Sequence, residues 1–456
     1  MVGVSGIRGI VDKDLTPDIV QRYAHAFGLW VREASCRTPT VVLGRDSRQS
    51  GPAFAKACTT GLLAAGCDVI DIGVVPTPTV QLAVTYHGAG GGIAITASHN
   101  PIQWNALKFI GPDSIFLDGK DGKRVLELVG KNGGSGKGEA GRVSQDSHAI
   151  ARHLEAVLKL PTVNVENIRA RNFSVALDAV RGAGGPVIRD LLERLGCRVT
   201  GINLETDGAF PRAPEPVPEN LGELSALVRR TKADIGIAVD PDVDRLAIVD
   251  EQGNPIGEDY TLAFAVRAVL RPPHRPAAQP PPFVVVNLST SLVVADAARD
   301  CGATLVRTPV GEAHVARKIV ELDCPIGGEG NGGVMYPALH VGRDAPVAAA
   351  LALELVARTD KRVSELVSAS PRYAIVKAKV ERGAALEPVY RQLKAGFPDA
   401  EIDEQDGLRL GWRDRWLHVR PSNTEPIIRL IAEAPTAEQA QRLVDQGRRL
   451  CGGATR

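Results

Sequence analysis

The segments VVLGRDSR (residues 41–48) and GCDVIDIG (residues 66–73) flank a helical pattern, and together they predict a β-α-β unit. The same arrangement recurs in FSVALDAV (173–180) with GCRVTGINL (196–204), and in FVVVNLSTS (283–291) with GATLVRTPV (302–310). In each copy a glycine followed by cysteine or alanine introduces the second strand. An internal repeat in which strands and helices alternate predicts three similar α/β domains with mixed, mostly parallel sheets.

Each repeat continues to a loop that is rich in glycine or in acidic residues. The three loops are TASHNP (96–101), DPDVDR (240–245) and GGEGNGG (327–333). In open α/β sheets, ligands bind beyond the carboxyl ends of the strands. We therefore expect the three domains to present three equivalent loops at their ligand-binding edges.

The loop TASHNP follows GGGIAI (90–95), an apolar run that predicts a buried strand delivering Ser98 to a loop tip. A hydroxyl is a weak nucleophile, so chemistry at Ser98 requires a neighbouring base or an electrophile held in line. His99 is adjacent and Lys108 follows shortly, but no GxSxG elbow surrounds the serine, which argues against a hydrolase triad. A serine that merely caps a turn is the structural alternative.

Three carboxylates alternate in the second loop, between the apolar runs IGIAV and LAIV: Asp240, Asp242 and Asp244. They would repel one another unless a cation lies among them. Glu251 falls where an EF-hand calcium loop has its last ligand, but Arg245 replaces the required glycine and strands flank the loop. The pattern predicts an octahedral Mg²⁺ site, with an acidic surface turn as the alternative.

The third loop combines five glycines with Glu329 and Asn331. Glycines allow close backbone approach, and a carboxylate with an amide suits the hydroxyls of a sugar, although a phosphate-binding turn would show the same residues. A fourth loop, VRPSNTEPIIRL (419–430), predicts a phosphate site or a capped turn with Glu425 neutralising one arginine. The groups it offers to phosphate are Arg420, Ser422, Asn423, Thr424 and Arg429.

The opening segment GVSGIRGIV (3–11) is too rich in glycine for a plain strand. Its glycines would let the backbone approach a ligand, and the guanidinium of Arg8 could bind an oxyanion. A flexible N-terminus with a solvated arginine is the alternative.

The chain has 456 residues, of which 44% are hydrophobic, and this allows several domains with their own cores. A net charge of +1 provides no overall field for nucleic acid or for an anionic membrane. Seven cysteines without a CxxC pair favour reduced thiols. With no charged leader and no apolar run of spanning length, we expect a soluble cytoplasmic protein.

The composition also predicts domain boundaries. KNGGSGKGEAG (131–141) is typical of a surface loop or a linker, and RPPHRPAAQPPP (271–282) cannot form regular structure because proline lacks a donor. After residue 368 the pattern changes to a strand, a helix and a hairpin, which predicts a smaller α+β domain. The expected domains are 1–150, 151–253, 254–367 and 368–456.

The motifs GIRG (6–9), TASHNP, DPDVDR, GGEGNGG and RPSNTEP (420–426), in this order, make the chain resemble the α-D-phosphohexomutases over nearly its full length. The resemblance implies three related α/β domains and a C-terminal α+β domain around a central cleft. It implies a reversible phosphoryl transfer between C6 and C1 of a hexose phosphate, through a phosphoserine and a hexose 1,6-bisphosphate. Within this family, phosphoglucosamine mutase, phosphoglucomutase and phosphomannomutase activities are all compatible with these motifs.

The resemblance also implies roles for single residues. Ser98 would carry the phosphoryl group and bind Mg²⁺ together with the three aspartates, and Arg8, Lys108 and Arg245 would surround it. Lys108, or otherwise His99, would act as general acid and base. Glu329, with Asn331 beside it, would contact the sugar, and the loop from Arg420 to Arg429 would hold the distal phosphate.

One departure from the family pattern leaves the hexose open. Many bacterial relatives end the sugar loop with Ser-Gly-His, whereas this chain has Asn331, Gly332 and Gly333. Either no residue of this chain takes the role of that histidine, or His340 or His314 takes it. A non-catalytic sugar-phosphate sensor and a Mg²⁺-dependent sugar phosphatase are the rival functions, and the oligomeric state is expected to be monomer or homodimer.

Overall fold

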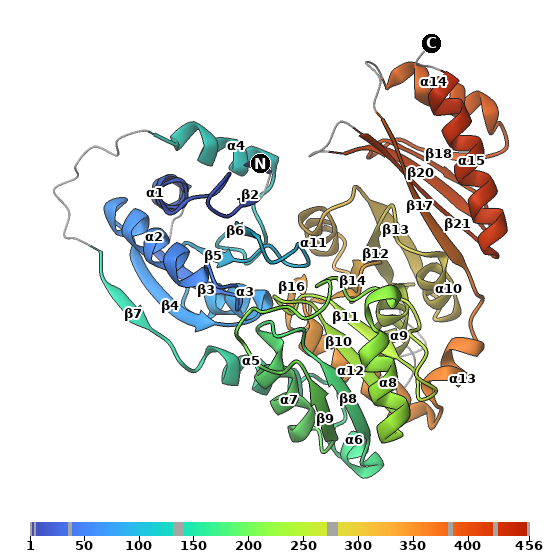
Figure 1. The fold of residues 1–456 in the computed structure, drawn as a ribbon, viewed down its shortest axis with the longest axis horizontal. Helices are drawn as coiled ribbons and strands as arrows, with labels where there is room; N and C mark the ends of the chain where they lie inside the picture. The colour runs from blue at the N-terminus through green and yellow to red at the C-terminus, as the bar shows by residue number, and fades with distance from the viewer. Residues whose placement is uncertain are drawn as a thin grey trace.

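The computed structural model describes residues 2–3, 6–34, 39–130, 141–270, 281–381, 386–422 and 427–453. The chain forms four domains arranged along an arc, with the N-terminal and C-terminal domains at its two ends (Figure 1). Residues 131–140 and 271–280 lie outside the described residues, so the two expected loops stay predictions. In the described ranges, no helix has the length and the apolar character needed to cross a membrane.

The first domain contains β1 (Val2–Gly3), β2 (Gly6–Ile10), β3 (Thr40–Arg45), β4 (Asp68–Val74), β5 (Gly91–Ile95), β6 (Trp104–Ile110) and β7 (Val143–Gln145). Its helices are α1 (Pro17–Ala34), α2 (Gly51–Ala64), α3 (Thr77–Tyr86) and α4 (Gly119–Leu128). The strands form one sheet in the order β1-β2-β6-β5-β3-β4-β7. Strands β5, β3, β4 and β7 are parallel, and the remaining pairs are antiparallel.

The second domain contains α5 (Ala149–Leu158), α6 (Val165–Arg171), β8 (Ser174–Asp178), α7 (Gly184–Arg194), β9 (Arg198–Ile202), α8 (Gly222–Thr231), β10 (Ile235–Val239) and β11 (Leu246–Val249). The third contains α9 (Asp259–Leu270), β12 (Phe283–Asn287), α10 (Leu292–Asp300), β13 (Thr304–Thr308), α11 (Glu312–Glu321), β14 (Ile326–Glu329), β15 (Gly333–Tyr336), β16 (His340–Arg343), α12 (Ala345–Thr359) and α13 (Val363–Ser368). Their sheets have the orders β11-β10-β8-β9 and β13-β12-β14-β15-β16.

The three sheets share one four-stranded core, which confirms the repeat. Its strand order is β4-β3-β5-β6 in the first domain, β9-β8-β10-β11 in the second and β13-β12-β14-β15 in the third. In every copy the first three strands are parallel and the fourth is antiparallel. The loops TASHNP, DPDVDR and GGEGNGG each lead from the third core strand into the fourth. They are therefore structurally equivalent, as the sequence predicts.

The helix α12 joins the second and third domains. Asp344 caps its start by accepting a hydrogen bond from the Val347 amide at 2.9 Å, and residues 345–357 are buried all round. A helix that is apolar on every face belongs in a core. One hydrophobic core accordingly runs through the second and third domains, whereas the first and fourth have main cores of their own.

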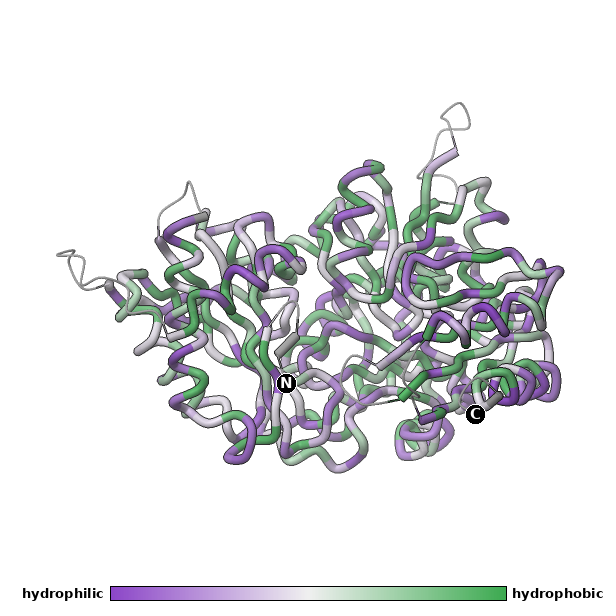
Figure 2. Tube along the Cα trace, turned by 90° about the horizontal axis from the view of Figure 1, so that it is seen from above, coloured by the Kyte–Doolittle hydropathy of each residue, from purple (hydrophilic) through white to green (hydrophobic). Residues whose placement is uncertain are grey.

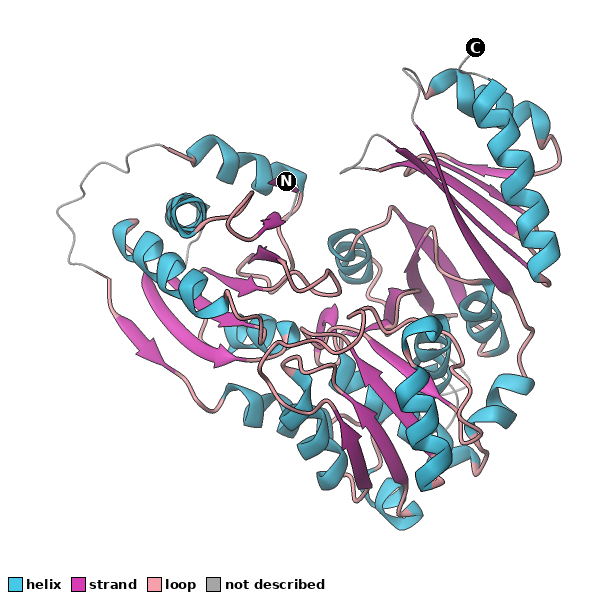
Figure 3. Ribbon diagram, viewed as in Figure 1, coloured by secondary structure: helices cyan, strands magenta, loops and turns pink. Residues whose placement is uncertain are grey.

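The fourth domain is a five-stranded antiparallel sheet in the order β17-β21-β20-β19-β18. Its strands and helices are β17 (Ala374–Glu381), α14 (Glu387–Gly396), β18 (Glu401–Asp403), β19 (Leu408–Gly411), β20 (Trp416–Pro421), β21 (Ile427–Ala434) and α15 (Ala437–Gly453). Both helices lie on one face of the sheet (Figure 3). The α+β prediction for this domain is confirmed. Over the described chain, hydrophobic and hydrophilic stretches are interspersed along the trace (Figure 2).

The N-terminal segment departs from the sequence prediction. Residues 6–10 form a regular strand, β2, which pairs antiparallel with β6 so that Arg8 lies opposite Ala106. Gly6 has φ +153°, and a Cβ there would lie 1.9 Å from the carbonyl oxygen of Leu107. The glycine therefore permits close strand pairing and does not interrupt the strand.

Candidate active site

Ser98 lies in the turn after β5, where the backbone takes a left-handed conformation with φ +48°. Its amide donates to the Thr96 hydroxyl at 2.9 Å, and the residue is buried. Its hydroxyl donates to Oδ2 of Asp240 at 2.7 Å. The structure thus brings the predicted phosphoserine position against the predicted metal loop of the next domain.

Arg48, just beyond β3, fixes the shape of this turn. Its side chain is fully buried, and its Nε donates to Asp46 Oδ2 at 3.0 Å. The guanidinium also donates to the carbonyl oxygens of Ser98 (2.6 Å), Asn100 (2.7 Å), Pro101 (2.9 Å) and Trp104 (2.9 Å). The carbonyl groups of an irregular loop lack the regular partners of a helix or strand, and one arginine donates to four of them here. Arg48 could not be predicted from the sequence, because no local motif links it to the loop.

The three aspartates lie between β10 and β11, and one oxygen from each falls within 4.8 Å of the others. Burial and the neighbouring carboxylates raise the pKa of Asp240 well above its ordinary value. Oδ1 of Asp242 and Oδ1 of Asp244 are buried and accept no hydrogen bond among the described residues. A hard divalent cation would supply the missing partner of these oxygens, so the residues present fit Mg²⁺.

Lys108, on β6, is a cation that contacts two of these carboxylates. Its Nζ lies 2.7 Å from Asp242 Oδ2 and 3.4 Å from Asp244 Oδ2. Burial opposes the lysine charge, but the two carboxylates prevail and raise the pKa of Lys108. For Asp242, burial opposes ionisation, and Lys108 nevertheless lowers the pKa of that carboxyl. The ammonium group of Lys108 is therefore protonated in this arrangement.

His99 follows Ser98 in this turn, and Arg8, on β2, contacts the same loop. The Nδ1 of His99 is buried without a hydrogen-bond partner in the described part of the chain. Burial, together with the nearby Arg245 and Arg8, lowers the pKa of His99 well below its ordinary value, so the imidazole is neutral. Arg8 donates to Asn100 Oδ1 at 2.9 Å. Arg245 is buried, with Nη1 3.2 Å from Glu215 Oε1.

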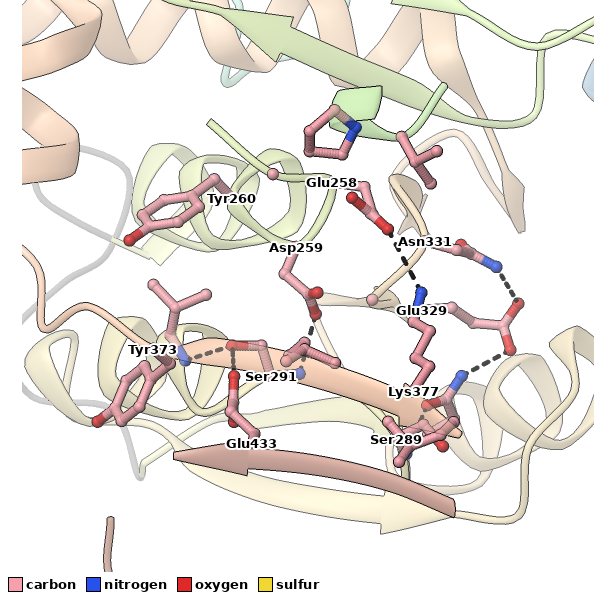
Figure 4. A pocket seen from close by; sticks show the side chains of 18 of the residues that line it. Glu258, Asp259, Tyr260, Ser289, Ser291, Glu329, Asn331, Tyr373, Lys377 and Glu433 are labelled. Atoms are coloured by element: carbon pink, nitrogen blue, oxygen red, sulfur yellow. Dashed lines mark hydrogen bonds and ion pairs between the residues drawn. The ribbon is translucent and has the colours of Figure 1, made fainter. Parts of the chain in front are cut away.

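The sugar-loop carboxylate Glu329 ends β14 and is buried. It accepts hydrogen bonds from Asn287 Nδ2 at 2.8 Å and Arg343 Nη1 at 2.7 Å, and a longer one from Asn331 at 3.4 Å. Burial opposes its charge, but Arg343 and these donors hold the pKa of Glu329 below its usual value. Figure 4 shows Glu329 and Asn331 side by side at one edge of a cavity.

This cavity has a volume of about 580 Å³ and lies between the third and fourth domains, with Glu215 to Glu219 of the second domain also along its lining. It extends from Glu329 and Asn331 to Arg420 and Arg429, which lie opposite each other on β20 and β21. Ser422 is buried nearby, while Asn423 and Thr424 lie outside the described residues. The predicted sugar and phosphate loops therefore line one cavity, and Ser98 does not line it.

The two histidines that could take the role left by the sugar-loop glycines lie in different surroundings. Nε2 of His340 lies 2.8 Å from Asp344 Oδ2, and its Nδ1 accepts from the Gly342 amide, so both nitrogens serve a buried structural network. His314 is exposed. The side chain beside Gly333 belongs to Arg343, a second residue that no sequence motif indicates.

Comparison with known proteins agrees with this geometry. Four domains of the phosphoglucomutase/phosphomannomutase family match this chain in order. They are alpha/beta/alpha domain I at residues 1–133, domain II at 151–253, domain III at 257–373 and the C-terminal domain at 375–450. The chain belongs to the phosphoglucomutase/phosphomannomutase family. It is therefore a phosphohexomutase, an enzyme of the isomerase class.

Relatives of this phosphohexomutase carry more than one substrate name. A probable phosphoglucosamine mutase of Methanopyrus kandleri is 38% identical and aligns over 97% of this chain and 96% of its own. A phosphoglucomutase/phosphomannomutase of Thermococcus kodakarensis is 37% identical over 99% of this chain and 98% of its own. The crystal structure of a family protein from Burkholderia thailandensis superposes with a TM-score of 0.85 at 28% identity, covering 99% and 96% of the two chains.

Proposed function

We propose that this phosphohexomutase transfers a phosphoryl group reversibly between C6 and C1 of a hexose phosphate, with Ser98 as the carrier and a hexose 1,6-bisphosphate as the intermediate. The observation that carries the proposal is the 2.7 Å hydrogen bond from the Ser98 hydroxyl to Asp240. It joins a nucleophile from one domain to a cation-binding loop from the next. Mere sugar binding requires neither group.

Asp240, Asp242 and Asp244 would hold Mg²⁺ together with an oxygen of phosphorylated Ser98. The metal, when bound, supplies positive charge that stabilises a transferring phosphoryl group. Lys108, Arg8 and Arg245 add protein cations around the same position. Phosphoryl transfer depends chiefly on positioning and on neutralising the charge of the equatorial oxygens, and these side chains provide both.

Proton transfer would use the two titratable groups beside Ser98. Protonated Lys108 donates to the serine oxygen as the phosphoryl group leaves, and it takes a proton back in the reverse transfer. His99, which is neutral, would accept the proton that the sugar hydroxyl loses, and it is the second choice for the role of Lys108. Either group must come within hydrogen-bond distance of the reacting oxygen.

The cavity supports the other half of the proposal. Glu329 and Asn331 would bind sugar hydroxyls, and Arg420, Ser422 and Arg429, with Asn423 and Thr424, would hold the phosphate that is not reacting. After the first transfer the bisphosphate turns over, so that the other phosphate faces Ser98. A phosphatase would not need a second phosphate site at the far end of a cavity.

The test is phosphopeptide mapping after incubation with glucose 1,6-bisphosphate, followed by a mutase assay. We expect phosphate on Ser98 and conversion of hexose 1-phosphate to hexose 6-phosphate. Phosphate on another residue would remove Ser98 from the mechanism, and steady release of inorganic phosphate would favour the phosphatase. Parallel kcat/KM values for glucosamine 6-phosphate, glucose 1-phosphate and mannose 1-phosphate identify the hexose.

A further inference from the structure

Arg343, the last residue of β16, contacts three buried carboxylates from three separate elements. Its Nη2 lies 2.6 Å from Asp244 Oδ2 in the metal loop, and its Nη1 lies 2.7 Å from Glu329 Oε2 in the sugar loop. Its Nε lies 3.1 Å from Oε2 of Glu312, the first residue of α11. The arginine side chain is only 9% exposed. One cation therefore connects the loop for the metal with the loop for the sugar.

Gly333 creates the space for this side chain. A Cβ at position 333 would lie 2.2 Å from Cδ and 2.8 Å from Cγ of Arg343. The backbone of Gly333, unlike those of Gly328 and Gly332, does not have a positive φ. The backbone conformation at position 333 therefore does not require a glycine. The close packing of the Arg343 side chain does require one.

Arginine suits this position because its planar guanidinium can donate in several fixed directions at once, whereas a lysine ammonium is a compact point charge. The contact is not needed to join the two domains, because one hydrophobic core already runs through both. Its effect is therefore local: it fixes Asp244 and Glu329 relative to each other. Without it, three carboxylates would remain buried close together with one cation fewer.

We propose that Arg343 is a positioning residue that holds the metal-loop carboxylate Asp244 and the sugar-loop carboxylate Glu329 in one rigid frame, within the space that Gly333 leaves open. The inference rests on the proposed function, because it assigns the two loops to metal and to sugar. Reacting groups must be held within a fraction of an ångström for efficient transfer, and such a frame supplies that precision.

The first test compares Arg343→Met and Arg343→Lys in the full-length chain. We expect Arg343→Met to lower kcat at least tenfold and to raise KM at least threefold, because both loops lose their common support. Arg343→Lys should recover part of kcat. A residue that only binds substrate phosphate would raise KM alone, and a kcat of Arg343→Met within twofold of wild type would overturn the inference.

The second test is a double-mutant cycle with Gly333→Ala. In the wild-type background this change should displace Arg343 and lower kcat at least fivefold; in the Arg343→Met background it should cost less than twofold. Equal losses in both backgrounds would show that Gly333 serves another purpose. Circular dichroism and thermal unfolding verify that each variant is folded.

A third measurement does not depend on turnover. Calorimetric titration with Mg²⁺ should show at least threefold tighter binding to Arg343→Met than to wild type, because a positive charge next to a ligand carboxylate has been removed. Gly333→Ala should shift the affinity in the same direction. Unchanged or weaker binding would contradict the contact between Arg343 and Asp244. If wild type bound Mg²⁺ but converted no hexose phosphate, the proposed function would fail while this test remained valid.

Discussion

The hydroxyl of Ser98 donates to Asp240 at 2.7 Å, although 142 positions separate the two residues in the sequence. Replacing the serine removes the hydroxyl that carries the phosphoryl group in the proposed mechanism. We expect Ser98→Ala to lose nearly all mutase turnover and to keep its unfolding midpoint, since the change lies in a loop. Ser225→Ala is the matched control, because that buried hydroxyl has no hydrogen-bond partner in the described structure. Turnover remaining in Ser98→Ala would assign the phosphoryl group elsewhere.

Asp242→Asn should lower kcat at least tenfold and weaken Mg²⁺ binding, because it replaces an anionic ligand of a hard cation with a neutral amide. It also removes the carboxylate that pairs with Lys108 at 2.7 Å. Assays across a Mg²⁺ titration measure both effects. Asp414→Asn, at an exposed carboxylate in the fourth domain, is the control. Full wild-type activity after exhaustive chelation would show that the aspartates are not a metal site.

Arg48→Lys should lower kcat at least tenfold while the protein stays folded. Lysine has three donors, whereas Arg48 serves Asp46 and four carbonyls of the Ser98 loop, so part of the loop loses its partners. Amide hydrogen exchange across residues 96–104 should become faster in the variant. Exchange and kcat that both match wild type would show that the loop holds its shape without Arg48.

The sequence predicts the repeat, the loops and the domain types because these depend on local patterns of apolar residues, glycines and charges. It predicts that Ser98 and Asp240 lie on equivalent loops, but their contact depends on how two domains pack. Arg48 and Arg343 were missed for the same reason, since their partners are distant in the chain. The strand at residues 6–10 was missed because its glycines serve a close strand pairing that only the partner strand reveals.

Acid should lower the folding stability of the protein through His418, which lies at the junction between the third and fourth domains. Its Nδ1 lies 2.9 Å from the Ser289 hydroxyl, and its Nε2 lies 2.7 Å from the Asp406 carbonyl oxygen. Burial lowers the pKa of His418 to about 4, below the ordinary histidine value of 6.5. Between these two values the unfolded chain binds more protons than the folded chain, so stability is lost as the pH falls from 6.5 toward 4.

At pH 5 this effect amounts to about 2 kcal/mol relative to pH 7.5, at roughly 1.4 kcal/mol per pKa unit. Urea unfolding at the two pH values, followed by tryptophan fluorescence, measures it. His418→Gln should show a smaller difference between the two pH values, because glutamine does not titrate. The same pH dependence in wild type and in the variant would assign the effect to other groups.

Arg420 and Arg429 should act on binding and on retention of the intermediate. They lie opposite each other on β20 and β21, at the end of the cavity that begins at Glu329. Interactions far from the reacting oxygen position the substrate and keep the bisphosphate bound between the two transfers. We expect Arg420→Ala and Arg429→Ala each to raise KM by the equivalent of about 1.5 to 3 kcal/mol, the usual cost of a lost charged hydrogen bond. Free hexose bisphosphate should accumulate in the reaction, measured by chromatography.

Arg415→Ala removes an exposed arginine of the same domain and should change neither the KM nor the amount of released bisphosphate. A double mutant with wild-type KM and no released bisphosphate would place the distal phosphate elsewhere, because a lost anchor must show either in affinity or in escape of the intermediate.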